Sequence, residues 1–183
     1  MLYFIVNEKS RSGKGAAVWR EVQETLHAEK VAYKAWVTEY EGHALALARE
    51  ICARDDDDIC LVALGGDGTA NEVINGITDF ERVRFGVIPT GSGNDMARGL
   101  GITGNPTENL KRILACMQMD KAQCRTIDLG EVRYKGGETS RLFAISSGLG
   151  LDAIVCKKAL KSKLKDTLNK LHLGKLTYLL LTV

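Results

Sequence analysis

The residues best placed to do chemistry form a glycine-rich motif, GGDGT, at positions 65–69. The motif follows the apolar run ICLVAL and precedes ANEVINGI, so it lies where a buried strand gives way to a helix. A helix start bordered by glycines offers free backbone N–H groups and a partial positive charge, and both attract phosphate. Asp67, at its centre, would repel a phosphate oxygen about 4 Å away by roughly 4 kcal/mol at an effective dielectric constant of about 20.

A divalent cation between Asp67 and the phosphate would remove this repulsion. Magnesium takes one or two carboxylates and completes its shell with waters and substrate phosphates. The motif therefore predicts a Mg-nucleotide site, in which Gly65, Gly66 and Gly68 let the backbone approach and Asp67 faces the metal. The spacing leaves one alternative open, a Gly-Asp-Gly turn whose aspartate caps the following helix.

Two further loops contain glycine and lead into helices, at 7–15 after the first predicted strand and at 89–94 after the fourth. Ligands of doubly wound sheets bind beyond the carboxyl ends of the strands, so all three loops would meet at one edge. A Walker loop is absent, because Gly13-Lys14 is followed by Gly15, and no GxGxxG pattern follows the first strand. The sequence thus excludes an ordinary P-loop enzyme and an obvious dehydrogenase.

Alternating strands and helices are predicted to position these loops. The predicted strands, mostly apolar, are 2–6, 31–37, 59–64 and 85–89. The predicted helices are 16–30, 42–54, 69–77 and 106–117, with a short helix beginning at Asp95. This order predicts an α/β fold with a parallel sheet covered by helices on both faces.

The pattern changes after these elements. Residues 125–135 and 138–149 predict a β-hairpin, and residues 152–172 predict a basic helix. The chain then ends within an apolar run. We therefore expect a nucleotide-binding α/β domain at 1–125 and, at 126–183, the start of a second, β-rich domain that is truncated.

Composition excludes several classes of protein. Of 183 residues, 45% are hydrophobic and 26% are charged, as in ordinary globular chains, and the net charge of +2 predicts no nucleic acid partner. No apolar run reaches the about 18 residues that predict a transmembrane helix. The five cysteines show no CxxC spacing, which favours free thiols in the reducing cytoplasm over a disulfide framework or a zinc site.

Seven lysines lie between residues 157 and 175, beside a stripe of leucines at helical spacing. Such a helix can lie on an anionic bilayer, where each lysine contributes about 1 kcal/mol near the surface. The alternative, which we favour, is a helix that packs its leucines onto a further domain and leaves its lysines in water.

Two motifs together, GGDGTANEV at 65–73 and GVIPTGSGNDMAR at 86–98, resemble the diacylglycerol kinase catalytic-domain family, which includes sphingosine kinases and bacterial lipid kinases. FIVNEKSRSGKG at 4–15 is similar to the family's NPxSGxG nucleotide loop. RTIDLGEV at 125–132 and FAISSGLGLDAIV at 143–155 are similar to its next two segments. The resemblance spans nearly the whole chain and implies a Rossmann-like fold of the phosphofructokinase and NAD-kinase type.

The resemblance also implies a set of nucleotide-binding residues. These cofactor-binding residues are Asn7, Ser12, Gly13, Lys14, Thr38, Gly65, Gly66, Asp67, Gly68, Thr69, Asn71, Glu72, Ser92, Asn94 and Asp95. Asp67 is implied as the catalytic and metal-binding residue, with ATP and Mg²⁺ as cofactors, and Asp128 matches a further acid of the family.

Some of these positions keep two interpretations. Relative to the family pattern a Ser-Arg pair is inserted, so either Ser10 or Ser12 could contact the nucleotide. Asn94 and Asp95 begin a helix and could simply cap it. Arg98 could pair with Asp95 or reach a phosphate.

The family implies an ATP- and Mg-dependent lipid kinase that transfers the γ-phosphoryl group of ATP to a diacylglycerol-like lipid hydroxyl. The chain would be the N-terminal nucleotide-binding part, and we expect it to be incomplete for catalysis. The implied partners are ATP and a lipid at a membrane surface, and a homodimer is a candidate assembly. We expect a protein that is cytoplasmic, or peripheral at the membrane. Two alternatives stay open: a NAD-kinase-like small-molecule kinase, and a non-catalytic nucleotide-binding module.

Overall fold

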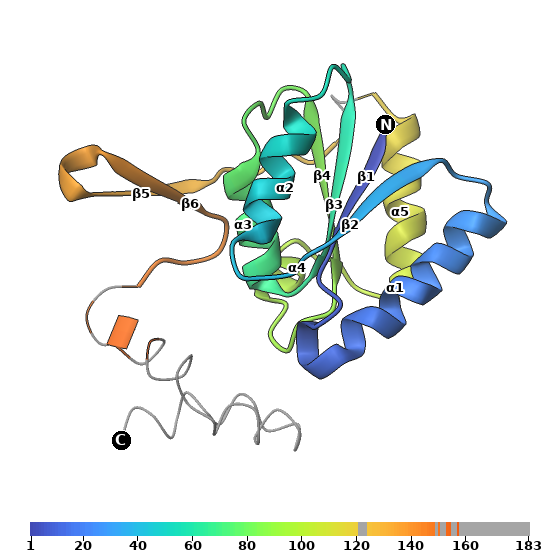
Figure 1. Ribbon diagram of the computed structural model, residues 1–183, viewed down its shortest axis with the longest axis horizontal. Coiled ribbons are helices and arrows are strands. Elements are labelled where there is room, and N and C mark those ends of the chain that lie inside the picture. The colour runs from blue at the N-terminus through green and yellow to red at the C-terminus, as the bar shows by residue number, and fades with distance from the viewer. Residues whose placement is uncertain (121–123, 149, 151–152, 155–156, 158–183) are drawn as a thin grey trace. The chain divides into compact units, whose positions relative to one another are not determined.

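The computed structural model describes residues 1–120, 124–148, 150, 153–154 and 157, and the chain forms two compact units, Met1–Ile145 and Ser146–Val183 (Figure 1). The strands of the first unit are β1 (Leu2–Val6), β2 (Tyr33–Val37), β3 (Ile59–Gly65), β4 (Val83–Pro89), β5 (Gly130–Tyr134) and β6 (Thr139–Phe143). Its helices are α1 (Ser10–Ala28), α2 (His43–Cys52), α3 (Asp67–Gly76), α4 (Asp95–Gly99), α5 (Pro106–Gln118) and the 3-10 turn η2 (Lys135–Gly137). The predicted basic helix at 152–172 falls mainly outside the described residues.

Four strands form a parallel sheet in the order β2-β1-β3-β4. Leu2 of β1 pairs with Tyr33 on one side and with Cys60 on the other, which places β1 and β3 at the centre. Every residue of β1 and β3 is buried, as their continuous apolar sequences predicted. The parallel α/β fold is therefore confirmed.

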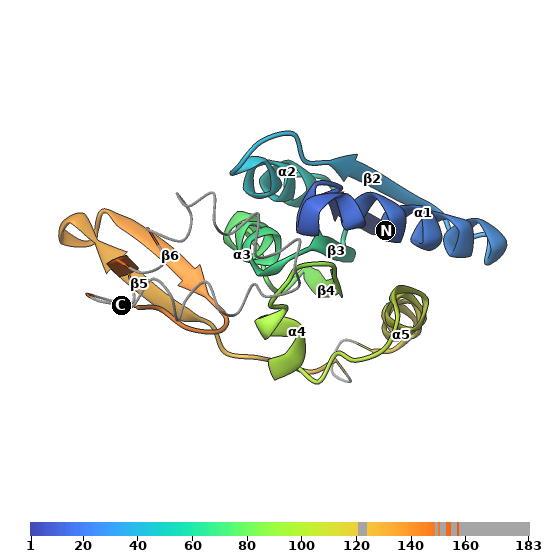
Figure 2. The same cartoon turned by 90° about the horizontal axis from the view of Figure 1, so that it is seen from below.

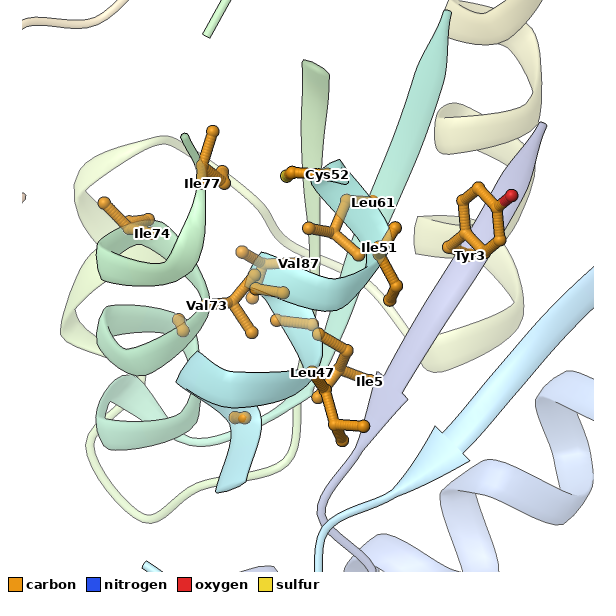
Figure 3. Close-up of a cluster of buried hydrophobic side chains, with 14 of the residues drawn as sticks. Tyr3, Ile5, Leu47, Ile51, Cys52, Leu61, Val73, Ile74, Ile77 and Val87 are labelled. Carbon is orange, nitrogen blue, oxygen red and sulfur yellow. The ribbon is translucent and has the colours of Figure 1, made fainter. Parts of the chain in front are cut away.

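Helices cover both faces of this sheet, with α1 and α5 on one side and α2 and α3 on the other (Figure 1; Figure 2). The hydrophobic cluster under α1 and α5 contains Leu2, Phe4, Val6, Trp19, Val22, Leu26, Cys60, Val62, Leu64, Ile88 and Leu110. The cluster under α2 and α3 includes Tyr3, Ile5, Leu47, Ile51, Leu61, Val73 and Val87 (Figure 3). Successive residues of β1 and β3 alternate between the clusters because side chains of a strand point to opposite faces.

Two helices begin earlier than the sequence predicted. β3 runs through Gly65 and α3 starts at Asp67, so Gly66 alone connects strand to helix. α1 begins with a turn at Ser10, but Arg11, Ser12 and Gly13 have left-handed backbone angles with φ of 47°, 58° and 93°. The regular part of α1 therefore begins after Gly13, and residues 11–13 form a tight, non-helical turn within the predicted loop.

The hairpin of β5 and β6 is antiparallel, from Gly130 opposite Phe143 to Tyr134 opposite Thr139. Its strands are shorter than the predicted ranges, and Asp128, which we expected within the first of them, lies before β5 and is exposed. The hairpin belongs to the first compact unit, where β6 contacts α3. The domain boundary after residue 125 stays a prediction.

Candidate functional site

The loops after β1, β3 and β4 lie together at the carboxyl edge of the sheet, because these strands are parallel neighbours. The side-chain amide of Asn7 donates to the Thr69 hydroxyl, with 3.1 Å between Nδ2 and Oγ1. The hydroxyls of Ser10 and Thr90 share a hydrogen bond of 2.6 Å. The three predicted loops are thus fastened to one another by side chains at their bases.

The strand ladder continues into these loops. The backbone N–H of Asn7 donates to Leu64 O, and that of Thr90 donates to Gly65 O, each at 2.8 Å. On the other side of β1, the N–H of Thr38 donates to Val6 O at 2.8 Å, and Thr38 is buried. Four strand ends therefore present a continuous, hydrogen-bonded edge beneath the loops.

Glycine is required at two points, one facing a side chain and one facing the backbone of a neighbouring loop. A Cβ on Gly65 would lie 2.6 Å from the Thr69 side chain, which folds back over the end of β3. A Cβ on Gly91 would lie 2.7 Å from Gly66 Cα, in the neighbouring loop. Since real Cβ atoms do not approach that closely, the GGDGT and GSGND segments can pack this tightly only as glycines.

The loop after β1 is shaped by Gly15, whose absent side chain leaves room for Asn7 O and for Ser10 Oγ, the latter 2.5 Å from where a Cβ would be. This arrangement turns Ser10 toward Thr90. Ser12 and Lys14 are both exposed. Of the two serines left open by the sequence, Ser10 lies in the contact between loops and Ser12 faces solvent.

The sequence left open that the Asp67 carboxylate caps the helix that follows it. In the structure it does not cap α3. Its Oδ1 accepts a hydrogen bond from the backbone N–H of Met96, 3.0 Å away in the first turn of α4. Its Oδ2 lies 3.2 Å from the position that a Cβ on Gly93 would take, and Asp95 Oδ2 lies 3.4 Å from the same position. Two carboxylates from different helices therefore converge beside Gly93.

This pair fits a magnesium ion that keeps most of its waters. Magnesium is held by one or two carboxylates together with waters and substrate phosphates, not by a dedicated protein cage. The described part of the chain has no group of three or more His, Cys, Asp or Glu side chains that could hold a metal. Asp67 and Asp95, the latter also paired with Arg98, are the two carboxylates at this edge that could hold Mg²⁺.

Comparison with known proteins identifies the family. The model of the diacylglycerol kinase catalytic domain matches residues 1–132, which is well over half of the chain. The chain belongs to this family. The match covers all four strands of the parallel sheet and the three loops at its edge.

Relatives of this diacylglycerol kinase family extend the similarity along the chain. The Bacillus subtilis protein named "Putative lipid kinase YtlR" is 32% identical over 96% of this chain and 56% of its own length. The "Diacylglycerol kinase" of Bacillus subtilis is 41% identical over 50% of this chain and 28% of its own length. The matched regions therefore cover a little over half of the first relative and less than a third of the second.

A solved structure supports the fold assignment. The structure titled as a diacylglycerol kinase from Bacillus anthracis str. Sterne aligns with a TM-score of 0.52 and 30% identity, over 62% of this chain and 41% of that one. The Rossmann-like assignment made from the family resemblance agrees with this neighbour.

The family's Asn-Asp pair lies at the start of α4. Asn94 is in the left-handed region, with φ of 53°, and its side chain does not cap the helix. Its Oδ1 is buried without a hydrogen-bond partner in the described structure. Asp95 pairs with Arg98, and because both side chains are more than half exposed this ion pair contributes little to stability. Of the two roles considered for Arg98, the structure shows the ion pair.

Two residues that follow GGDGT in the family motif contact other elements of the fold. Both carboxylate oxygens of Glu72 accept backbone N–H groups at the start of α2, from Gly42 at 3.0 Å and Ala44 at 3.2 Å. The Asn71 amide donates to Leu142 O of the hairpin at 3.0 Å. Both residues therefore position α2 and β6 relative to the helix that starts at Asp67.

Several residues at this edge were not predicted from the sequence. Ser10 was one of two alternatives, and Gly15, Thr90 and Gly91 belong to the family motifs but had no predicted role. Small residues beside the assigned glycines were the signal that could have found them. Met96 contributes only its backbone N–H, for which its side chain gives no signal.

The charges around the first loop favour an anionic ligand. Lys9, Arg11 and Lys14 are exposed on it, and Lys9 Nζ donates to Glu39 O at 3.2 Å.

No helix in the described part of the chain is long and apolar enough to span a bilayer.

Proposed function

We propose that this chain is the nucleotide-binding part of a lipid kinase, which uses Mg-ATP and transfers the γ-phosphoryl group to a diacylglycerol-like hydroxyl. The observation that carries the proposal is the contact between Asp67 and Met96, because it joins the two glycine-containing family motifs at one edge of the sheet. Membership of the diacylglycerol kinase family supports the type of reaction.

Phosphoryl transfer depends mainly on positioning and charge stabilisation, and different residues at the sheet edge would provide each. Backbone N–H groups at the start of α3 face the phosphates, and Gly66 carries no side chain that would compete for them. Lys14 and Arg11 add positive charge at the loop after β1. Asn94 Oδ1, buried and unpaired, is an acceptor suited to a hydroxyl or to a metal-bound water.

Bound magnesium would neutralise charge on the transferred phosphoryl group. Asp67 is suited to this site because Met96 fixes one of its oxygens and leaves the other directed toward Gly93. The lipid hydroxyl would approach the γ-phosphate at this edge, and the protein would then work in the cytoplasm or at a membrane surface. A homodimer stays a candidate assembly.

Transfer of labelled γ-phosphate from ATP to diacylglycerol in mixed micelles tests the proposal. The protein carrying this chain is expected to label the lipid only when Mg²⁺ is present, while the chain itself is expected to bind ATP with Mg²⁺ in a thermal-shift assay. Label on nicotinamide dinucleotide instead of lipid would establish the small-molecule alternative. ATP binding by the protein without transfer to either acceptor would establish a non-catalytic module.

A further inference from the structure

Tyr40 and His43 form an aromatic stack on the loop between β2 and α2, outside the residues that the family resemblance assigned. The ring centroids are 4.5 Å apart and the planes differ by 6°. Tyr40 is 63% exposed although one face of its ring is covered by His43. The opposite face is therefore open to a planar ligand.

The stack is held in place by contacts within its own loop and by one contact to α3. The backbone N–H of Glu39 donates to His43 Nδ1 at 3.1 Å, which fixes the orientation of the imidazole. Gly42, with φ of 88°, makes the turn between the two rings and donates its N–H to Glu72 of α3. Because these contacts orient His43, which covers one face of Tyr40, stacking on the other face costs little additional ordering.

The position of the stack matches the far end of a bound nucleotide. The loop leaves the carboxyl end of β2, two strands and about 10 Å across the edge from β3, whose loop faces the phosphates. Lys9 Nζ bonds Glu39 O, so the phosphate-side loop after β1 touches the loop of the stack. A nucleotide with its phosphates at α3 can extend across β1 and bring its base to the end of β2.

Charge indicates which end of the nucleotide belongs there. Glu39 and Glu41 flank Tyr40 and are exposed, so the side chains next to the ring disfavour phosphate, while the cation of Lys9 lies on the side toward the loop after β1. An uncharged base is not repelled, and every nucleobase has a π face that stacks on an aromatic ring.

We propose that the open face of Tyr40, supported by His43, is the stacking platform for the nucleobase. This inference rests on the proposed nucleotide function and adds a binding residue to it. Since stacking tolerates any base, the platform contributes affinity for ATP and GTP alike, and not selectivity between them.

Calorimetric titration with ATP and with tripolyphosphate, both in Mg²⁺, tests the platform, because tripolyphosphate has the phosphates without the base. Tyr40→Ala is expected to weaken ATP binding by about 5- to 150-fold and to leave tripolyphosphate binding unchanged. Tyr40→Phe keeps the ring and is expected to bind ATP like the parent. Tyr134→Ala, at an exposed tyrosine of the hairpin, is the matched control and is expected to change neither affinity.

Three results would overturn the platform. Unchanged ATP affinity in Tyr40→Ala would remove the stacking role and leave the nucleotide proposal intact. Equal losses for ATP and tripolyphosphate would show that Tyr40 shapes the loop and does not hold the base. Failure of the parent chain to bind ATP at all would reject the nucleotide proposal and the platform together.

Discussion

The Asp67 carboxylate on α3 accepts a hydrogen bond from the Met96 backbone N–H on α4, with 3.0 Å between Oδ1 and N. These residues belong to the two motifs that together define the family resemblance, and the bond makes them one structural unit. It also shows how a segment with the glycine pattern of a phosphate loop can contain an acid. One oxygen has a structural partner, and the other lies beside Gly93, as does the carboxylate of Asp95.

Two substitutions at Asp67 separate its structural role from its charge. Asn keeps an oxygen that can accept the Met96 N–H, whereas Ala keeps none. We expect Asp67→Asn to fold like the parent but to lose the Mg²⁺ dependence of ATP binding, because the charge that faces the metal is gone. We expect Asp67→Ala to lose about 0.5–2 kcal/mol of unfolding free energy as well. Urea denaturation and ATP titration with and without Mg²⁺ measure both effects, and a fully Mg-dependent Asp67→Asn would contradict the metal role.

A methyl group at Gly91 should force the GGDGT and GSGND segments apart. Its Cβ would lie 2.7 Å from Gly66 Cα, and neither backbone can turn away as a side chain could. We expect Gly91→Ala to cost about 1–3 kcal/mol of unfolding free energy, as overpacking does, and to weaken ATP binding. Gly99→Ala is the matched control, because a Cβ there meets nothing within 4 Å. Equal stability of the two variants would show that the loops can separate freely.

The parallel sheet was predictable because its central strands are apolar throughout and bounded by glycine or polar residues. β1 and β3 lie within about one residue of the predicted ranges. Helix starts were harder to predict. Asp67 was expected in a loop and lies in the first turn of α3. The left-handed backbone at Arg11 and Ser12 could not be predicted, because residues other than glycine rarely adopt this conformation.

Long-range partners could not be predicted from the sequence, because they depend on how elements meet in space. Nothing in the sequence near Glu72 indicates that its carboxylate caps α2 thirty positions earlier. The same holds for Asn71, whose amide was assigned to the nucleotide by resemblance and bonds Leu142 of the hairpin. The sequence indicated that Glu72 and Asn71 are polar groups of the family motif, but their hydrogen-bond partners depend on which elements the fold brings next to α3.

The hairpin is held to α3 by a side chain that imitates a neighbouring strand. Asn75 Oδ1 accepts the Leu142 N–H at 2.8 Å, and Asn75 Nδ2 donates to Leu142 O at 3.0 Å. We expect Asn75→Ala to speed hydrogen exchange at the Leu142 amide, because a part-buried backbone group loses its partner at a cost of about 1–3 kcal/mol. Asn75→Asp should have a smaller effect, since an acceptor is retained.

Glu138→Ala, in the exposed turn of the same hairpin, is the control and should leave exchange at Leu142 unchanged. If the Leu142 amide exchanged in Asn75→Ala at the same rate as in the parent, other contacts would hold β6 on α3. A rise in exchange throughout the sheet would indicate global destabilisation, and would contradict a role confined to the hairpin.

The thiol of Cys60 on β3 should make the fold sensitive to alkali. Burial raises its pKa from the ordinary 9.0 to about 12, with the nearby Arg84 opposing this and Asp58 adding to it. Above pH 9 the unfolded chain releases this proton while the folded chain retains it, so the unfolding free energy falls as pH rises toward about 12. The expected slope is about 1.4 kcal/mol per pH unit, measured by urea denaturation across this range.

Cys60→Ala isolates the contribution, because it removes the titrating group whatever its effect on stability at neutral pH. Its stability should fall less steeply than that of the parent from pH 9 upward. Burial also raises the pKa of Tyr3, and the Asp56 carboxylate that its hydroxyl contacts adds to the shift, so some slope above pH 10 should persist until Tyr3 is replaced by Phe. Equal slopes for the parent and Cys60→Ala between pH 9 and 10 would show that the thiol ionises in the folded protein as it does in the unfolded chain.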